Sequence, residues 1–321
     1  MVRTRVLISC IQMQRVLASF EAEFAQHDIE LVVPTITGQQ LSEVELLKLM
    51  PEIDGVIAGD DPFTSAVLSA SPRLRTIAKW GIGTDSIDRQ TAESLGILVT
   101  NTAGVFDDEV ADTAIGYVLL LARQLHQIDA RVRAGQWFKP RGETLRGKVL
   151  SLLGLGAIGR GTAVRAQAFG MSVVGADPSP DAQKAATDMG ISVVDLDTAA
   201  GAGDYFVIAA SLSASSEGLV DARLLRLMPP GSRIINVARG RIIDETDLIE
   251  ALQDGHLAGA ALDVFVEEPP SPDNPLLAMD AVILGSHNSS NTAEGVSRAS
   301  SRALENLLTG LSASKRFTEG R

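Results

Sequence analysis

The sequence predicts an α/β protein with two doubly wound parallel sheets, and two observations lead to that prediction. Short apolar runs alternate with helix-like segments along the 321-residue chain, a pattern typical of parallel strands joined by crossover helices. One turn between an apolar run and a helical segment, at residues 154–159, carries regularly spaced glycines. The length is sufficient for two ordinary domains, each with its own core.

Five apolar runs in the first hundred residues predict the strands of a first sheet. These runs cover residues 6–9, 29–33, 55–58, 74–78 and 97–100. Between them, helical patterns cover residues 14–26, 42–50 and 88–95. This order of elements predicts parallel strands with crossover helices.

A second set of elements predicts a second sheet. It opens with a long helical segment over residues 107–123, whose apolar positions include Val110, Ala114, Val118 and Leu121. Strands are then expected at residues 148–153, 172–176, 191–194, 205–209, 233–236, 258–263 and 281–284, and a last helix at residues 293–308. No Pro/Gly/Ser-rich linker separates the two sets, so composition alone does not place the domain boundary.

Composition and charge exclude several classes of function. The formal net charge is -12, and Lys and Arg form no basic stripe, so we expect no nucleic-acid partner. The apolar stretch at the N-terminus is too short for a signal peptide, and no run approaches the length of a membrane span. We therefore expect a soluble, cytoplasmic protein with no membrane partner. The single cysteine, Cys10, excludes an intramolecular disulfide and is expected to be a buried structural thiol.

The glycines at residues 154–159 match the G-x-G-x-x-G fingerprint of dinucleotide-binding turns. Gly154 would permit the tight turn, Gly156 would let the backbone approach a pyrophosphate, and Gly159 would let the helix pack on the strand. N–H groups at the N-terminus of the helix, aided by its dipole, would bind the phosphates. The predicted cofactor loop comprises Gly154, Gly156, Ala157, Ile158 and Gly159.

An acidic residue at the end of the next strand indicates which dinucleotide is bound. Asp177 lies near the spacing of ~20 residues expected for the carboxylate that binds the adenosine ribose. A carboxylate at this place accepts hydrogen bonds from the ribose hydroxyls and repels a 2′-phosphate. Because Pro178, Ser179 and Pro180 follow, with no basic residue among them, the pattern favours NAD over NADP.

Three ionisable residues, Arg239, Glu268 and His287, each follow a predicted strand in the second half of the chain. Because the carboxyl ends of parallel strands form the ligand crevice of such sheets, we expect these side chains to converge. A histidine can give or take a proton near neutral pH, and a carboxylate can orient its ring. An arginine can bind a carboxylate and polarise a carbonyl. This set favours hydride transfer to or from a small anionic 2-keto or 2-hydroxy acid.

The segments around these residues resemble the signatures of the D-isomer-specific 2-hydroxyacid dehydrogenases, the family that includes phosphoglycerate dehydrogenase and glyoxylate/hydroxypyruvate reductase. The resemblance is carried by NVARG, ALDVFVEEP and SHNSSNT, and KWGIGTDSID and NTAGVFDDEVAD extend it over nearly the whole chain. It implies an NAD-dependent D-2-hydroxyacid dehydrogenase. In such an enzyme Arg239 would bind the substrate, Glu268 would be the partner of the histidine, and His287 would be the acid/base.

The same resemblance implies further contacts and a domain layout. Asp263 and the backbone of Val237 and Ala238 would lie against the nicotinamide, and Ile82 and Gly83 would offer N–H groups to the substrate carboxylate. A flavodoxin-like substrate domain would combine residues 1–102 with 290–321, and the Rossmann NAD-binding domain would be inserted at residues 103–289. A homodimer, with the cofactor domain supplying the interface, is also implied.

Several positions depart from the family pattern and leave the substrate open. Ser286 replaces the usual proline before the histidine, and Ser289 replaces the usual glycine two residues after it. Lys79 stands where several relatives have arginine, and the loop Asp60–Thr64 lacks the arginine that grips phosphate in some phosphoglycerate dehydrogenases. Both 3-phosphoglycerate and hydroxypyruvate or glyoxylate therefore stay candidates, and the physiological direction is not fixed.

Pattern alone does not decide every role. Glu267 competes with Glu268 as the partner of the histidine, and only the resemblance selects Glu268. We expect no metal site, because the four histidines have no paired ligand spacing, and we expect His27, His126 and His256 to be structural. A second possible function is that of an NAD(H)-sensing, corepressor-like interaction protein with little turnover, since the same family includes such proteins. Oxidation of formate or phosphite is less favoured, because formate needs no histidine-centred acid/base chemistry.

Overall fold

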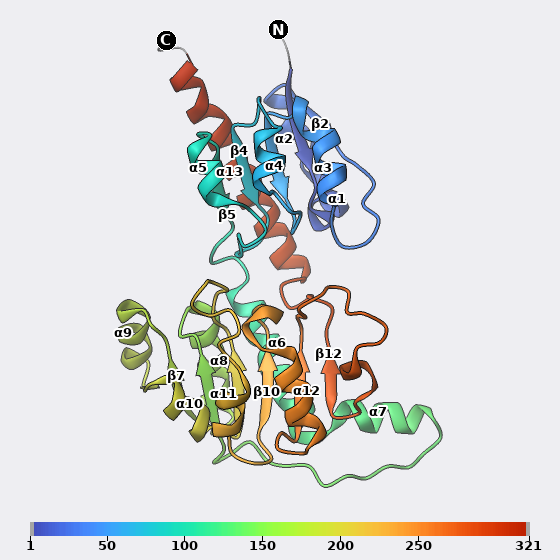
Figure 1. The fold of residues 1–321 in the computed structure, drawn as a ribbon, viewed down its shortest axis with the longest axis vertical. Helices are drawn as coiled ribbons and strands as arrows, with labels where there is room; N and C mark the ends of the chain where they lie inside the picture. The colour runs from blue at the N-terminus through green and yellow to red at the C-terminus, as the bar shows by residue number, and fades with distance from the viewer. Residues whose placement is uncertain (1–2, 319–321) are drawn as a thin grey trace. The chain divides into compact units, whose positions relative to one another are not determined.

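The computed structural model describes residues 3–318 and divides into two compact units (Figure 1). Unit 1 combines the chain up to Val105 with the chain from Asn291 onward, and unit 2 spans Phe106–Ser290. Residues 1–2 and 319–321, which the sequence analysis assigned to the substrate domain, lie outside the described residues.

Unit 1 contains a five-stranded parallel sheet in the order β2-β1-β3-β4-β5. Its strands are β1 (Thr4–Ile8), β2 (Ile29–Val32), β3 (Gly55–Ala58), β4 (Thr76–Lys79) and β5 (Leu98–Asn101). This is the flavodoxin-like strand order, as predicted. The register pairs Ala58 with Lys79 and Lys79 with Asn101, so the carboxyl ends of β3, β4 and β5 are level with one another.

The helices of unit 1 include the C-terminal helix. They are α1 (Ile11–Val16), α2 (Glu21–Gln26), α3 (Glu43–Leu49), α4 (Ser65–Ser69), α5 (Arg89–Ser94) and α13 (Ala293–Thr318). Helix α13 packs on β3 and β4, where a Cβ added to Gly55 would lie 2.8 Å from Leu307 Cδ1. Contact this close explains why a segment from the end of the chain joins a sheet built from the first hundred residues. Helix α13 also runs ten residues beyond the predicted 293–308.

The prediction of one continuous helix over residues 14–26 is wrong. A 3-10 turn, η1 (Leu17–Ser19), separates α1 from α2. Met13 on α1 and Phe24 on α2 are both buried, so the apolar pattern does mark the side that faces the core. An apolar pattern indicates which side chains are buried, but it does not indicate where a 3-10 turn interrupts a helix. Such turns are frequent at helix ends.

Unit 2 contains a seven-stranded parallel sheet in the order β12-β11-β10-β9-β6-β7-β8. Its strands are β6 (Val149–Leu153), β7 (Ser172–Ala176), β8 (Ser192–Val193), β9 (Tyr205–Ile208), β10 (Arg233–Asn236), β11 (Gly259–Leu262) and β12 (Val282–Leu284). From β6 the chain adds strands on one side up to β8, then on the other side from β9 to β12. This is the Rossmann order with one further strand, and its switch point lies between β6 and β9.

Helices lie on both faces of the sheet of unit 2 (Figure 1). They are α6 (Asp107–Arg123), α7 (Leu125–Arg133), α8 (Ala157–Ala168), α9 (Pro180–Asp188), α10 (Leu196–Ala202), α11 (Ala222–Leu227) and α12 (Glu245–Gln253). Helix α6 packs against α8, β10 and β11. It begins and ends as predicted and buries Val110, Ala114, Val118 and Leu121. The left-handed backbone of Gln124 (φ 51°) ends α6 and turns the chain into α7.

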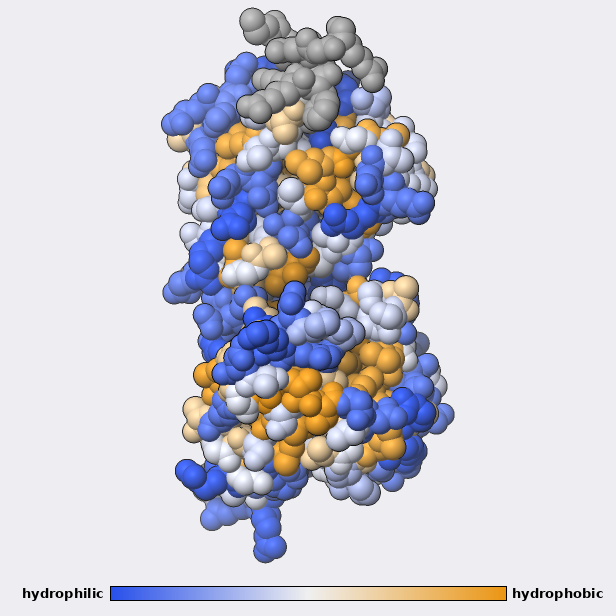
Figure 2. Space-filling model, turned by 90° about the vertical axis from the view of Figure 1, so that its left-hand side faces the viewer, coloured by the Kyte–Doolittle hydropathy of each residue, from blue (hydrophilic) through white to orange (hydrophobic). Residues whose placement is uncertain are grey.

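The surface of each unit keeps hydrophobic residues between hydrophilic ones, as Figure 2 shows for one face. Exposed apolar area of this kind is ordinary for globular proteins. Within residues 3–318, no helix combines the length and the apolar character that crossing a membrane would require.

Cys10, at the start of α1, is buried as predicted. Burial raises the pKa of its thiol to about 11, so the thiol is protonated at neutral pH. A protonated, buried thiol packs as a small apolar group and is a poor nucleophile.

Candidate active site

The predicted site residues of unit 2 all lie at the carboxyl edge of its sheet. Gly154 follows β6, Asp177 follows β7, Arg239 follows β10, Glu268 follows β11 and His287 follows β12. Because the strands are parallel, these positions share one edge. The strands β10, β11 and β12 are neighbours, so the segments that carry Arg239, Glu268 and His287 lie side by side.

His287 and Glu268 are in direct contact. His287 Nδ1 lies 2.7 Å from Glu268 Oε2, and Glu268 Oε1 accepts a hydrogen bond from the backbone N–H of Phe265 at 2.9 Å. The two side chains are 25% and 24% exposed, so the pair is sheltered but reachable from solvent. Pattern alone could not choose between Glu267 and Glu268, and in the structure Glu268 is the one that contacts the ring.

The backbone of His287 is in the left-handed region, with φ 54°. That conformation costs a non-glycine residue roughly 1–2 kcal/mol, so neighbouring groups have to hold it. The N–H of His287 donates to the carbonyl of Asp263 at 2.7 Å. The next two residues are also fixed by Asp263, through its carboxylate.

The carboxylate of Asp263 is the centre of a buried hydrogen-bond network and is 2% exposed. Oδ1 accepts from the Tyr117 hydroxyl and from the N–H of Asn288, each at 3.2 Å. Oδ2 accepts from the N–H of Ser289 at 3.0 Å and from the Ser289 hydroxyl. Burial and the negative charge of Asp263 raise the pKa of the Tyr117 hydroxyl, which therefore stays a proton donor. A Cβ at Gly285 would overlap both Asp263 Oδ1 and the Tyr117 hydroxyl, so position 285 requires glycine.

Arg239 is held by hydrogen bonds with residues at the end of β10, the strand that it follows. Its Nη1 donates to the carbonyl of Ala238 at 2.8 Å, and its carbonyl accepts from Asn236 Nδ2 at 2.9 Å. The following residue, Gly240, packs on the Phe265 backbone so closely that a Cβ there would overlap it. The loops after β10 and β11 therefore meet backbone to backbone, which places Arg239 beside the segment that carries Glu268. Val237 and Ala238, predicted to lie against the nicotinamide, are nearly buried at the same strand end.

The glycine loop has the shape that a pyrophosphate needs. Gly154 has φ +101°, and a Cβ there would lie 2.7 Å from the Ala210 nitrogen. A Cβ at Gly159 would overlap the Gly154 carbonyl oxygen, so both glycines are required by packing. Gly156 differs, because a Cβ there would meet open space. It is also the N-cap of α8, which begins at Ala157. The N–H groups of Ala157 and Ile158 therefore belong to the first turn, whose donors have no acceptor within the helix.

Asp177 and Arg160 bring opposite charges to this loop, and both contact the backbone of Leu155. The carboxylate of Asp177 accepts from the N–H of Leu155 and from the N–H of Ser179, each at 2.8 Å. Each carboxylate oxygen has two lone pairs, so these bonds leave capacity for ribose hydroxyls. Arg160 Nη1 donates to the carbonyl of Leu155 at 2.6 Å, which brings a positive charge to the glycine loop.

Ile82 and Gly83, the predicted substrate-binding residues of unit 1, lie in the loop that follows β4. The N–H of the preceding residue, Gly81, donates to Thr102 Oγ1 at 2.9 Å, and Asn101 Nδ2 donates to the Ile82 carbonyl at 2.7 Å. The end of β5 thus fixes this loop. Contact of Ile82 and Gly83 with a substrate stays a prediction.

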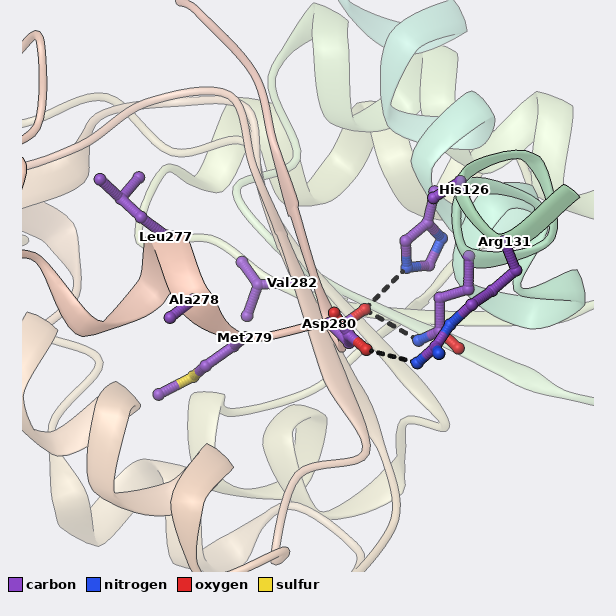
Figure 3. Close-up of a pocket in the computed structure, with 9 residues that line it drawn as sticks. His126, Arg131, Leu277, Ala278, Met279, Asp280 and Val282 are labelled. Atoms are coloured by element: carbon purple, nitrogen blue, oxygen red, sulfur yellow. Dashed lines mark hydrogen bonds and ion pairs between the residues drawn. The ribbon is translucent and has the colours of Figure 1, made fainter. Parts of the chain in front are cut away.

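A pocket of unit 2 lies between α7 and the segment that leads into β12 (Figure 3). Three side chains of α7 converge there on Asp280: His126 Nε2 and Gln127 Nε2 lie 3.2 and 2.8 Å from its carbonyl oxygen, and Arg131 Nη2 lies 3.1 Å from its carboxylate. Asp280 precedes β12 whereas His287 follows it, so this pocket is at the amino end of the strand. The contacts anchor α7 to the sheet.

The remaining histidines also have local contacts. His256 Nε2 lies 3.0 Å from the Leu225 carbonyl oxygen, and His27 is the C-cap of α2. Within residues 3–318, no group of three or more His, Cys, Asp or Glu side chains is arranged to hold a metal ion.

Sequence reasoning missed three residues that the structure places at the site: Tyr117, Arg160 and Ser289. Arg160 directly follows the third glycine, so the fingerprint itself offered a signal. Ser289 was visible only as a departure from the usual glycine. Tyr117 gave no signal, since its position on α6 shows helical periodicity and nothing of the distant Asp263.

Known proteins of one family resemble this chain in sequence and in fold. A sequence model of the family described as D-isomer specific 2-hydroxyacid dehydrogenase, NAD binding domain, matches residues 115–289. The chain is 36% identical over 277 residues to a hydroxypyruvate reductase from Thermotoga maritima, which covers 85% of this chain and 89% of the relative. It is 38% identical over 266 residues to a D-3-phosphoglycerate dehydrogenase from Sus scrofa, covering 82% of this chain and 50% of the relative. The chain thus spans half the length of that relative.

A similar solved structure is that of an NADPH-dependent glyoxylate/hydroxypyruvate reductase from Sinorhizobium meliloti, in complex with NADP and malonate. The TM-score is 0.82 at 32% sequence identity, and the match covers 96% of this chain and 93% of that chain.

Removing the Tyr117 hydroxyl is expected to destabilise unit 2. Tyr117→Phe leaves Asp263 Oδ1 short of one buried donor, and the free energy of unfolding should fall by about 1 kcal/mol. Urea denaturation followed by circular dichroism measures this change. Tyr205→Phe is the matched control, because the buried Tyr205 hydroxyl has no hydrogen-bond partner among residues 3–318. An equal loss in both variants would contradict the role given to Tyr117.

Asp177 is expected to set the preference for NADH over NADPH. Asp177→Asn keeps one of the two oxygens that accept from the N–H groups of Leu155 and Ser179, and it removes the charge that repels a 2′-phosphate. Isothermal titration should show the ratio of the two dissociation constants moving toward NADPH by about tenfold, the scale of one charged hydrogen bond. Asp181→Asn, an equal charge change in the first turn of α9, should leave the ratio unchanged. A wild-type protein that bound both coenzymes equally would show that Asp177 does not discriminate.

Proposed function

The chain belongs to the D-isomer specific 2-hydroxyacid dehydrogenase family, and from that premise we propose that it transfers a hydride between NAD(H) and a small D-2-hydroxy acid or 2-keto acid. The observation that carries the proposal is the 2.7 Å contact between His287 Nδ1 and Glu268 Oε2, at the sheet edge that also carries the glycine loop. The candidate substrates are hydroxypyruvate, glyoxylate, and the pair of 3-phosphoglycerate and its 2-keto acid, 3-phosphohydroxypyruvate.

We propose that His287 is the acid/base of the reaction. With Nδ1 held by Glu268, Nε2 is the nitrogen that exchanges a proton with the substrate oxygen, giving it in reduction and taking it in oxidation. The carboxylate of Glu268 fixes the orientation of the ring and stabilises the imidazolium. Arg239 binds the substrate carboxylate and polarises the carbonyl with its planar, permanently charged guanidinium.

Unit 2 is proposed to be the cofactor domain and unit 1 the substrate domain. Bound NAD(H) supplies or accepts the hydride. The glycine loop, the N-terminus of α8 and Arg160 would hold the pyrophosphate, and Asp177 would hold the adenosine ribose. Asp263 and the backbone of Val237 and Ala238 would lie against the nicotinamide. Ile82 and Gly83 of unit 1 would bind the substrate carboxylate.

The proposal is tested by following NADH absorbance with a panel of 2-keto acids and with variants of the proposed catalytic residues. His287→Ala and Arg239→Ala should each lower kcat/KM by about 10²–10⁴-fold, since each removes a group that acts on the reacting carbonyl. Glu268→Gln should lower it less, and most at neutral and alkaline pH, where the imidazolium needs the carboxylate. The dissociation constant of NADH should stay close to that of the wild type in all three.

Two outcomes would contradict this mechanism. Normal turnover by His287→Ala or Arg239→Ala would remove these residues from the chemistry. A wild-type protein that binds NADH yet turns over no acid of the panel would point to a nucleotide-sensing protein, a function to which the comparisons give no support.

A homodimer built on unit 2 is also proposed. Apolar side chains are exposed at and after α7: Leu125 is 45% exposed, Val132 43% and Trp137 81%. Burying them against a second copy would stabilise the dimer by about 25 cal/mol per Å² of apolar area removed from water. Sedimentation equilibrium should give a dimer for the wild type and a larger dissociation constant for Trp137→Ser, and a wild-type monomer would refute it. The cytoplasmic location and the absence of nucleic-acid and membrane partners stay predictions.

A further inference from the structure

The carboxyl edge of the sheet in unit 1 is acidic. The loops that directly follow its five strands cover residues 9–10, 33–42, 59–64, 80–88 and 102–106. They contain Asp60, Asp61, Asp85 and Asp88, and no lysine or arginine. Among these loops and the last residues of the five strands, all within the described chain, Lys79 at the end of β4 is the one basic residue. Helix α13 adds Arg298, whose Nη2 donates to the carbonyl of Val105 at 3.1 Å.

The ammonium of Lys79 lies directly beneath the loop that carries Ile82 and Gly83. Its side chain is 3% exposed, and Nζ donates to the Trp80 carbonyl at 3.2 Å. A Cβ on Gly81 would lie 3.1 Å from Nζ, so the charge is packed against the turn that begins this loop. A charge placed here acts on any ligand that the loop binds.

Asp60 compensates this charge. Its Oδ1 lies 2.9 Å from Lys79 Nζ, and its side chain is 42% exposed, so the negative member of the pair is the one that reaches solvent. The neighbouring Asp61 has a different role, because it is buried and accepts hydrogen bonds from the Ser9 hydroxyl at 2.6 Å and from the N–H of Leu41 at 2.8 Å. Asp61 therefore ties loops together, and Asp60 sets the charge at the surface.

The two candidate substrate types differ in charge at this edge. A 2-keto acid such as hydroxypyruvate has one carboxylate, which the proposed mechanism gives to Arg239 and the Ile82–Gly83 loop. A phosphorylated 2-keto acid brings about 1.5 to 2 further negative charges and three acceptor oxygens. Sites that bind such groups supply unpaired cations, most often arginine, in bidentate geometry. Among the loops and strand ends of this edge, the one basic side chain is Lys79, and it is already paired with a more exposed aspartate.

We propose that the Lys79–Asp60 ion pair is a specificity determinant that admits 2-keto acids with an uncharged substituent, such as hydroxypyruvate and glyoxylate, and disfavours phosphorylated ones. This inference rests on the proposed function and narrows its substrate class. Asp60 discriminates by repelling a second anionic group, and Lys79 keeps the loop beneath the substrate carboxylate from becoming net negative. A second anionic group at this edge would meet the exposed carboxylate of Asp60, and like charges brought together at a binding surface disfavour the ligand that carries them.

The test compares kcat/KM for hydroxypyruvate and for 3-phosphohydroxypyruvate, with NADH, in the wild type and two variants. The wild type should prefer hydroxypyruvate by about a hundredfold. Asp60→Asn frees the charge of Lys79 and should shift the ratio toward the phosphorylated substrate by about tenfold, chiefly through KM. Glu93→Gln, the same charge change on the exposed side of α5, should leave the ratio as in the wild type. Raising the salt concentration should reduce the wild-type preference, because exposed charges are screened.

Each result has a separate meaning. If no 2-keto acid is reduced, the proposed function fails and not merely its substrate class. If the wild type reduces hydroxypyruvate but prefers the phosphorylated acid, the inference is wrong while the reaction class stands. If the preference is as expected but Asp60→Asn shifts the ratio no more than Glu93→Gln does, Asp60 is not the determinant. If the variant folds poorly, a wild-type preference for the phosphorylated acid, or a preference that salt does not change, would still overturn the inference.

Discussion

The arrangement of the candidate active site depends on the buried carboxylate of Asp263. This one group accepts hydrogen bonds from Tyr117 on α6 and from the two residues that follow His287, while its backbone carbonyl accepts from His287 itself. A buried carboxylate is costly unless its lone pairs are satisfied, so the loop after β12 can take few other conformations once Asp263 is folded into the core. The unfavourable left-handed backbone of His287 is maintained by these bonds.

From that fixed loop the rest of the site follows in order. The orientation of the loop presents His287 Nδ1 to Glu268 Oε2, and the second oxygen of Glu268 is held by the N–H of Phe265 in its own loop. The backbone of Phe265 in turn contacts Gly240, the neighbour of Arg239. Three loops from three adjacent strands are thus linked by backbone contacts. Together with the buried carboxylate of Asp263 and the contact of Glu268 with His287, this linkage holds the catalytic groups in place before a substrate binds, which is what preorganisation requires.

The parts of this protein that depend on local pattern could be predicted from the sequence. Both sheets, the glycine loop and Asp177 depend on runs of a few residues. Hydrophobic periodicity and residue spacing therefore predict them. What could not be predicted depends on contacts between distant residues: the bond from Tyr117 to Asp263 and the pairing of Lys79 with Asp60. Local pattern also left Glu267 and Glu268 open, and the resemblance to the family selected Glu268. The break in the helix at η1 could not be predicted for a different reason. The apolar pattern indicates which side of the segment is buried, and it continues unchanged through a 3-10 turn.

Three cations near the proposed ligand loops each donate a hydrogen bond to a backbone carbonyl. Arg160 donates to the Leu155 carbonyl, Arg239 to the Ala238 carbonyl and Lys79 to the Trp80 carbonyl, so each cation is tied to a loop that a ligand is proposed to touch. A carbonyl carries no net charge, so it fixes the direction of a cation without cancelling its field. A carboxylate partner does both. Because Lys79 also has the carboxylate of Asp60 at 2.9 Å, its charge acts locally on the loop that it supports and contributes little to attracting an anion from a distance.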